Sequence, residues 1–105
     1  MNIQSFNYRD QVSYSNEKAN KVVLTECDHA RTTLWCLKPG QHIHPHVHAG
    51  DHVWVVLEGE GLFLSEDQEH LPVSPGTILS APAGISHGME NSGAQGLIFA
   101  SISAG

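Results

Sequence analysis

The stretch DHVWVVLEGEGLFLS (residues 51–65) indicates the fold class of this chain of 105 residues. It contains two short runs rich in branched and aromatic residues, 51–58 and 61–65, with Gly-Glu-Gly at their junction. Runs of this length and composition favour β-strands, and glycine between them favours a tight turn. The stretch therefore predicts two strands joined by a turn.

The same pattern continues in both directions along the chain. Further strand-like runs, separated by Pro, Gly, Asn and Ser, lie at 21–27, 31–38, 70–74, 76–81 and 96–103. No long window shows a persuasive helical period, although the polar segment 14–21 leaves room for a short helix. This series of strands predicts an all-β sandwich or barrel over residues 21–105, preceded by an arm over residues 1–20.

The charge distribution limits the kinds of partner and site. The net charge is −6 with the histidines neutral, which argues against a nucleic acid partner. All five basic residues lie within the first 38 positions, and residues 39–105 contain seven acidic residues and no lysine or arginine. A site built from residues 39–105 would take its positive charge from elsewhere, and a metal ion would supply it.

The start of the chain and its cysteines indicate the cellular setting. The first residues lack the basic and apolar regions of a secretory signal, and no apolar run approaches the length of a membrane span. We therefore expect a cytoplasmic protein with no membrane partner. Cys27 and Cys36 are expected to be buried, reduced thiols, with metal ligation or a disulfide as the alternatives.

Five histidines crowd the stretch HIHPHVHAGDH (residues 42–52). The first four, at positions 42, 44, 46 and 48, point the same way wherever the strand stays extended. A turn over residues 49–51 can return His52 to His46 and His48, and His87 is a further candidate from the separate stretch PAGISHGMEN (82–91). Imidazoles from two adjacent strands and one distant strand predict a metal site at the mouth of a β-barrel. His29 and His70 are expected at the surface.

These residues resemble the two motifs of the cupins, a family of small antiparallel jelly-roll β-barrels. The first motif, G-x(5)-H-x-H-x(3,4)-E-x(6)-G, is matched over residues 40–59, except that His52 stands where the family usually has glutamate. The second motif, G-x(5)-P-x-G-x(2)-H-x(3)-N, is matched without exception over residues 76–91. The resemblance implies a jelly-roll β-barrel and a metal ion held by His46, His48, His52 and His87.

A site of four histidines has its own chemistry. Four neutral imidazoles leave a divalent ion with a charge of about +2, which strengthens its hold on anions and lowers the pKa of bound water. Imidazole ligands suit Fe, Mn, Ni, Cu or Zn. His42 and His44 are excluded from the ligand set, and we expect them at the pocket rim or as hydrogen-bonding or proton-transfer groups beside it. The motif glycines are expected at tight turns or at positive φ: Gly40, Gly59, Gly76 and Gly84.

The resemblance leaves several activities open. An apolar to aromatic pocket is expected from Trp35, Trp54, Val56 and Met89, which suits a small, partly apolar substrate that chelates the metal through oxygen. The absence of Lys and Arg after Lys38 argues against phosphorylated or nucleotide-linked sugars. We interpret the chain first as a dioxygenase-like oxidoreductase. The alternatives are a Lewis-acid isomerase or lyase acting on a sugar-derived carbonyl compound, a non-catalytic binding module, a structural zinc site and an empty barrel.

The arm carries more apolar side chains than an idle tail needs, namely Ile3, Phe6, Tyr8, Val12 and Tyr14. A short jelly roll also leaves open sheet edges, which small proteins tend to cover. We therefore predict a homodimer in which this arm or a sheet edge lies against the partner.

Overall fold

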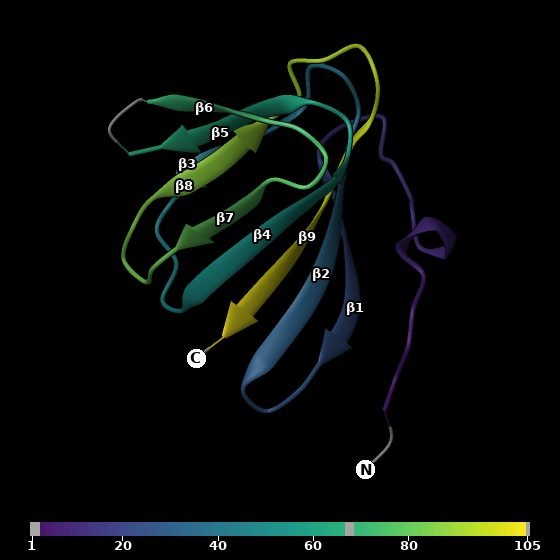
Figure 1. Ribbon diagram of the computed structural model, residues 1–105, viewed down its shortest axis with the longest axis vertical. Coiled ribbons are helices and arrows are strands. Elements are labelled where there is room, and N and C mark those ends of the chain that lie inside the picture. The colour runs from purple at the N-terminus through teal and green to yellow at the C-terminus, as the bar shows by residue number, and fades with distance from the viewer. Residues whose placement is uncertain (1–2, 67–68, 105) are drawn as a thin grey trace.

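The computed structural model describes residues 3–66 and 69–104 (Figure 1). Apart from one 3-10 turn, η1 (Tyr8–Asp10), the regular elements of these residues are strands: β1 (Asn20–Glu26), β2 (Ala30–Leu37), β3 (His42–His46), β4 (Asp51–Glu58), β5 (Gly61–Ser65), β6 (His70–Val73), β7 (Ile78–Ala81), β8 (His87–Glu90) and β9 (Leu97–Ala104). Within this part of the chain no helix is long and apolar enough to cross a membrane. The predicted all-β class is confirmed, and segment 14–21 holds no helix. Strands β3 and β8 lie outside the runs identified by composition but at the places where the histidines predicted strands. The expected adjacency of the 42–48 and 51–58 strands is wrong, because β3 and β4 belong to different sheets. Residues 1–2, 67–68 and 105, which belong to the expected arm and barrel, lie outside the described residues.

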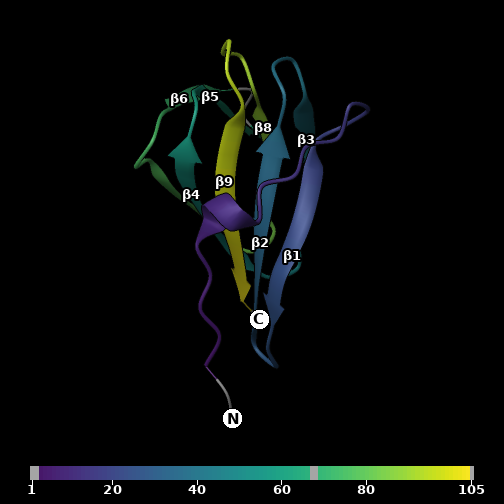
Figure 2. The same ribbon diagram turned by 90° about the vertical axis from the view of Figure 1, so that its right-hand side faces the viewer.

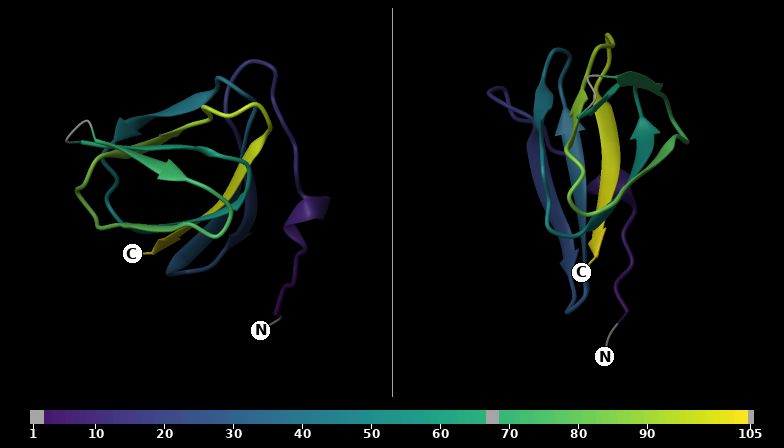
Figure 3. Two further views of the ribbon diagram at one scale, coloured as in Figure 1. Left: turned by 45° about the horizontal axis from the view of Figure 1, so that its top comes forward. Right: turned by 90° about the vertical axis from the view of Figure 1, so that its left-hand side faces the viewer.

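Two antiparallel sheets face each other across the core, as Figure 3 shows. One has the strand order β1-β2-β9-β4-β7 and the other the order β3-β8-β5-β6. Strands that are distant in sequence lie side by side, since β9 inserts between β2 and β4. The jelly-roll fold is thus confirmed. Among the described strands no hydrogen-bonded ladder joins the two sheets, so the barrel is an open sandwich rather than a closed cylinder.

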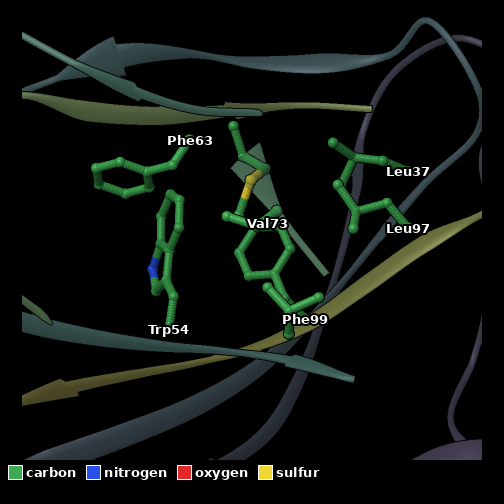
Figure 4. Close-up of a cluster of buried hydrophobic side chains, with 8 residues drawn as sticks. Leu37, Trp54, Phe63, Val73, Leu97 and Phe99 are labelled. Atoms are coloured by element: carbon green, nitrogen blue, oxygen red, sulfur yellow. The ribbon is translucent and has the colours of Figure 1, made fainter. Parts of the chain in front are cut away.

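The core between the sheets draws on both of them (Figure 4). Strand alternation sends Leu97 and Phe99 of β9 inward and Ile98 outward. The ring of Trp54 packs edge-on against Phe63, with 5.7 Å between centroids, and tilted against Phe99 at 4.7 Å. The buried residues of this cluster are Leu37, Trp54, Val56, Phe63, Val73, Met89, Leu97 and Phe99.

Asn91 and the glycines of the predicted motifs support the fold rather than the histidine site. The side-chain amide of Asn91, which is only 1% exposed, donates to the carbonyl oxygens of Leu37 and Gln95 and so holds two connections together. The four motif glycines all have positive φ, as predicted, with values between 86° and 95°. At Gly59 a Cβ would also collide with the carbonyl oxygen of Gly96.

The arm packs on the outer face of its own five-stranded sheet (Figure 2). Tyr8 and Val12 lie against a small second cluster made of Leu34, Cys36 and Ile98. Burial raises the pKa of the Cys36 thiol, which fits the predicted buried thiol. The prediction is wrong for Cys27, which is exposed because it lies in the turn between β1 and β2.

Candidate metal centre

Three imidazoles converge at one end of the sandwich. His48 follows β3, His52 lies in β4 and His87 begins β8, and one ring nitrogen from each lies within 4.8 Å of the others. His87 is 1% exposed, whereas the other two are partly open to solvent. The cluster therefore joins segments from both sheets.

A β-bulge in β3 decides which histidines face this cluster. Ile43 is opposite Met89 and His46 is opposite His87, so three steps along β3 match two steps along β8. Ile43 packs against the core, and the extra residue returns His46 and His48 to this inner side. The four alternate histidines are expected to share one face only where the strand stays extended, and the bulge between Ile43 and His46 ends that alternation.

The other two histidines form a separate exposed pair. The Nε2 atoms of His42 and His44 are 3.0 Å apart, and both side chains are exposed. The bulge, which separates this exposed pair from His46 and His48, requires a glycine at position 88 of the neighbouring strand β8. A Cβ at Gly88 would collide with the carbonyl oxygen of Ile43 and would lie 2.8 Å from the backbone nitrogen of Pro45.

His46 lies beside the cluster without joining it. Its ring centroid is 4.2 Å from that of His48, but its ligand atoms are outside the group of three. Its Nδ1 lies 2.9 Å from the carbonyl oxygen of His44; an N–H donated there leaves Nε2 free to bind an ion. The structure thus brings together three of the four predicted ligands and places the fourth at the edge. The exposed His29 and His70 lie at the surface, as expected.

The donor set fits a transition metal. The Nδ1 atom of His87 lies 2.9 Å from the carbonyl oxygen of Ile85, to which it donates, so Nε2 carries the lone pair and faces His52 Nδ1 at 3.3 Å. Metal-binding histidines are commonly oriented by such a bond to a carbonyl. Two nitrogens at about 2.0–2.1 Å from one ion are at most about 4.2 Å apart. Small shifts of the three rings would therefore suffice to hold an ion.

Burial keeps the three imidazoles neutral near pH 7. Desolvation, followed by the charges of His52, His46 and His87, lowers the pKa of His48 to about 4. Desolvation likewise lowers the pKa of His52 and that of His87, although the bond to Ile85 partly opposes the shift at His87. A cation therefore has few protons to displace from this site.

Two hydrogen bonds hold the loop before His87 against the other ligand segments. The Oδ1 atom of Asp51 accepts from the backbone of Ala83 at 2.8 Å, and the carbonyl oxygen of His48 accepts from Gly84 at 3.0 Å. Sequence reasoning missed Asp51. The signal was its place immediately before His52, where a turn carboxylate can bind nearby backbone amides.

A pocket of about 240 Å³ opens beside the imidazoles. Two of the four residues expected to line it, Trp35 and Trp54, do so, whereas Val56 and Met89 are 1% and 0% exposed within the core. The described residues around the pocket are Lys21, Arg31, Thr33, Trp35, Ile43, His46, His48, His52, Trp54, Ser101 and Ser103.

Lys21 and Arg31 bring positive charge to this pocket, contrary to the expectation from the charge distribution. That expectation assumed a site built from residues 39–105 alone. In the fold β1 and β2 join the same sheet as β4 and β9, so their inward side chains reach the pocket. The objection to phosphorylated or nucleotide-linked sugars, which was drawn from the missing Lys and Arg, therefore does not hold.

Comparisons with known proteins define the class. Residues 33–103 match the Cupin domain family. An uncharacterized conserved protein with a double-stranded β-helix domain from Klebsiella pneumoniae has a similar structure, with 31% identity and a TM-score of 0.92 over 98% of this chain and 90% of that one. No curated protein matches the chain.

Two other solved structures are similar at 25% identity. One is a predicted oxalate decarboxylase from Thermotoga maritima, with a TM-score of 0.77 over 82% of this chain and 79% of that one. The other is the polyketide cyclase RemF from Streptomyces resistomycificus, with a TM-score of 0.76 over 84% of this chain and 66% of that one. Together with the family match, the double-stranded sandwich and its histidine cluster identify this chain as a member of the cupin family.

Proposed function

We propose that this protein is a metal-dependent cupin enzyme that binds one divalent transition metal and a small oxygen-chelating substrate. His48, His52 and His87 would hold the ion, with His46 as the fourth ligand. The convergence of three neutral imidazoles beside an open pocket carries the proposal. When bound, the ion would polarise substrate oxygens and, if redox-active, support oxygenase-type chemistry.

The chain's own residues would prepare this site. The bond from His87 to Ile85 fixes one ring, and the contacts of Asp51 and His48 with residues 83–84 hold the loop that carries it. The pocket leaves room for substrate next to the ion, unlike a closed structural zinc site. The predicted cytoplasmic location accompanies this proposal as an expectation from the sequence.

Lewis-acid isomerase or lyase chemistry is the second candidate. The positive lining of the pocket favours a charged or strongly polar carbonyl compound over a mostly apolar one. Two similar structures are described as a predicted oxalate decarboxylase and a polyketide cyclase, so similar folds carry more than one kind of chemistry.

Metal content measured by elemental analysis after dialysis tests the site. The single variants His48→Ala, His52→Ala and His87→Ala should lose most of the bound metal, whereas His42→Ala and His44→Ala should retain it. The second pair is the matched control, because it removes imidazoles from the same tract on the outer face. Full retention in His87→Ala, or no metal in the unaltered protein, would contradict the proposal.

Oxygen uptake separates the two chemistries. Oxygen consumption and turnover would be measured for the iron-loaded and the zinc-loaded protein and then compared. Each form would be given pyruvate or catechol, two small probes that chelate through neighbouring oxygens. Uptake with iron alone is expected of the oxygenase. Turnover that is equal with both metals and consumes no oxygen would favour the Lewis-acid alternative, and binding without turnover would indicate a binding module.

A further inference from the structure

The pocket beside the three imidazoles combines positive charge with hydrogen-bond donors. Its described lining includes Lys21, Arg31, Thr33, Ser101 and Ser103, and contains no aspartate or glutamate. We propose that it binds a small 2-hydroxy or 2-oxo acid carrying a second anionic group, a carboxylate or a phosphoryl group. This inference rests on the proposed function: the chelating end of the acid would lie at the metal and the second group at Arg31 and Lys21.

The register of the five-stranded sheet places Arg31 close to the histidine cluster. Ser103 of β9 pairs with Arg31 of β2 on one side and with His52 of β4 on the other. Adjacent strands are about 4.8 Å apart, so the backbones of Arg31 and His52 are about 10 Å apart, and the two side chains share one face. An acid chelated at the metal needs to extend by only a few bonds to reach the guanidinium group.

Arg31 is available for a ligand. Its one ion pair in the described residues is with Glu26, at 3.9 Å, and both side chains are more than half exposed. Exposed pairs of this kind contribute little. The planar guanidinium group can then bind a carboxylate or phosphoryl group through two parallel hydrogen bonds. Lys21 lies over the ring of Trp35, 5.9 Å from its centroid, and adds a second positive charge.

Trp54 provides an independent indication that the pocket can take a polar ligand. Its indole Nε1 is the one buried side-chain nitrogen or oxygen of the described residues that has no hydrogen-bond partner. Trp54 is 4% exposed and lines the pocket, and in Figure 4 its nitrogen lies on the side of the ring away from Phe99. Because an unpaired buried donor is costly, a shift of the ring that opens Nε1 to the pocket would let an acceptor oxygen of a bound acid satisfy it.

The size of the pocket restricts the ligand to a small molecule. Its volume of about 240 Å³ is below the range of about 300–1,000 Å³ that is typical of pockets for drug-sized ligands. A short acid with an anionic group at each end matches this volume and the positions of the positive charges better than a large apolar substrate does.

Isothermal titration of the zinc-loaded protein with three related probes tests the inference. Lactate, malate and 3-phosphoglycerate are all 2-hydroxy acids, but they end in a methyl, a carboxylate and a phosphoryl group, respectively. We expect malate or 3-phosphoglycerate to bind about 10- to 100-fold more tightly than lactate, as charge-assisted hydrogen bonds imply. The tighter of the two identifies the second anionic group.

Substitutions assign this preference to residues. Arg31→Gln should reduce the preference for malate or 3-phosphoglycerate over lactate to within a few-fold, and Lys21→Gln should weaken this preference. Lactate binding and metal content should stay unchanged in both variants. Arg9→Gln and Lys38→Gln are matched controls, because neither residue lines the pocket. Trp54→Phe should weaken acid binding while the aromatic ring is kept.

Two results would overturn the inference: equal affinity for all three probes, or a preference that persists when Arg31 and Lys21 are both replaced. Failure to load zinc would instead contradict the proposed function. The malate and lactate titrations on that metal-free sample would then test the remaining part of the inference, because a tighter hold on malate still requires Arg31 and Lys21; equal binding of the two acids would overturn it.

Discussion

Gly88 is the residue on which the separation of the two histidine pairs depends. A side chain there would meet the backbone of Ile43 and Pro45, so Gly88→Ala should push β3 away from β8. We expect a loss of about 1–3 kcal/mol in the free energy of unfolding, as for overpacked sites, together with a lower metal content. Urea unfolding and elemental analysis measure the two effects.

Gly93→Ala is the control for this substitution. Its nearest contact, the carbonyl oxygen of Glu60, would lie 3.1 Å from the new Cβ, so little has to move. Equal stability losses in the two variants would contradict a special role of Gly88.

His52 occupies the position where cupins usually carry glutamate. His52→Glu should keep the metal while lowering the charge of the occupied site by about one unit, which shifts preference toward harder ions and weakens the hold on anions. Competition between manganese and zinc, followed by elemental analysis, checks the shift. His52→Ala should show weaker binding of both ions; an unchanged manganese-to-zinc ratio in His52→Glu would count against His52 as a ligand.

At the scale of elements, the loop before His87 depends on Asp51. Asp51→Ala removes the acceptor for the Ala83 amide and should lower metal affinity about 10- to 100-fold, the range found for groups that orient metal ligands. Asp51→Asn retains an Oδ1 acceptor and should keep most of the affinity. Chelator competition gives both values, and an Asp51→Ala variant that binds metal normally would exclude the positioning role.

The arm shields one of the two cysteines. In a Cys27→Ser background, Cys36 should react slowly with a thiol reagent, because Tyr8 and Val12 pack over its cluster and burial raises its pKa. Removing residues 1–14 should make the reaction much faster. The rate at which the reagent releases its leaving group measures the reaction of Cys36, and the rate in unfolded protein serves as the reference for a fully exposed thiol. Equal rates with and without the arm would show that the arm does not protect the cluster.

Most strands could be predicted because their alternation and turn residues are local signals, as in 51–58 and 61–65. The short β3 and β8 carry no such signal and form through pairing, since β8 lies between β3 and β5. The histidines of the cluster follow from motif spacing. The presence of Lys21 and Arg31 in the pocket lining could not be predicted from the motifs, because only the pairing of β2 with β9 brings this early part of the chain to the pocket.

At the scale of the whole molecule, the predicted homodimer places the arm or a sheet edge against the partner. Because the arm packs on its own sheet, we propose that the contact is the outer face of the five-stranded sheet, including its edge strand β7. The arm covers Leu34 and Cys36 there, but Ile78 and Ile102 remain 68% and 38% exposed on strands whose outward side chains share that face. Ile102→Lys and Ile78→Lys should therefore shift the mass toward that of one chain in light scattering.

Leu71→Lys is the control for this prediction, because Leu71 is 45% exposed on β6 in the other sheet. An unaltered chain with the mass of a monomer would exclude the dimer. If the dimer persists in both isoleucine variants, its interface lies on another surface.

The bulge in β3 also means that the number of residues in the chain, and not only their identity, determines which histidines reach the cluster. Deleting Pro45 would restore regular alternation between Ile43 and His46 and leave His46 and His48 facing inward. Deleting Val47 would turn His48 to the outside. Deleting one residue before His46 should therefore preserve the histidine cluster, whereas deleting one residue after it should disrupt the cluster. Gly88→Ala should become tolerable only in the chain that lacks Pro45, because that chain has no bulge opposite position 88.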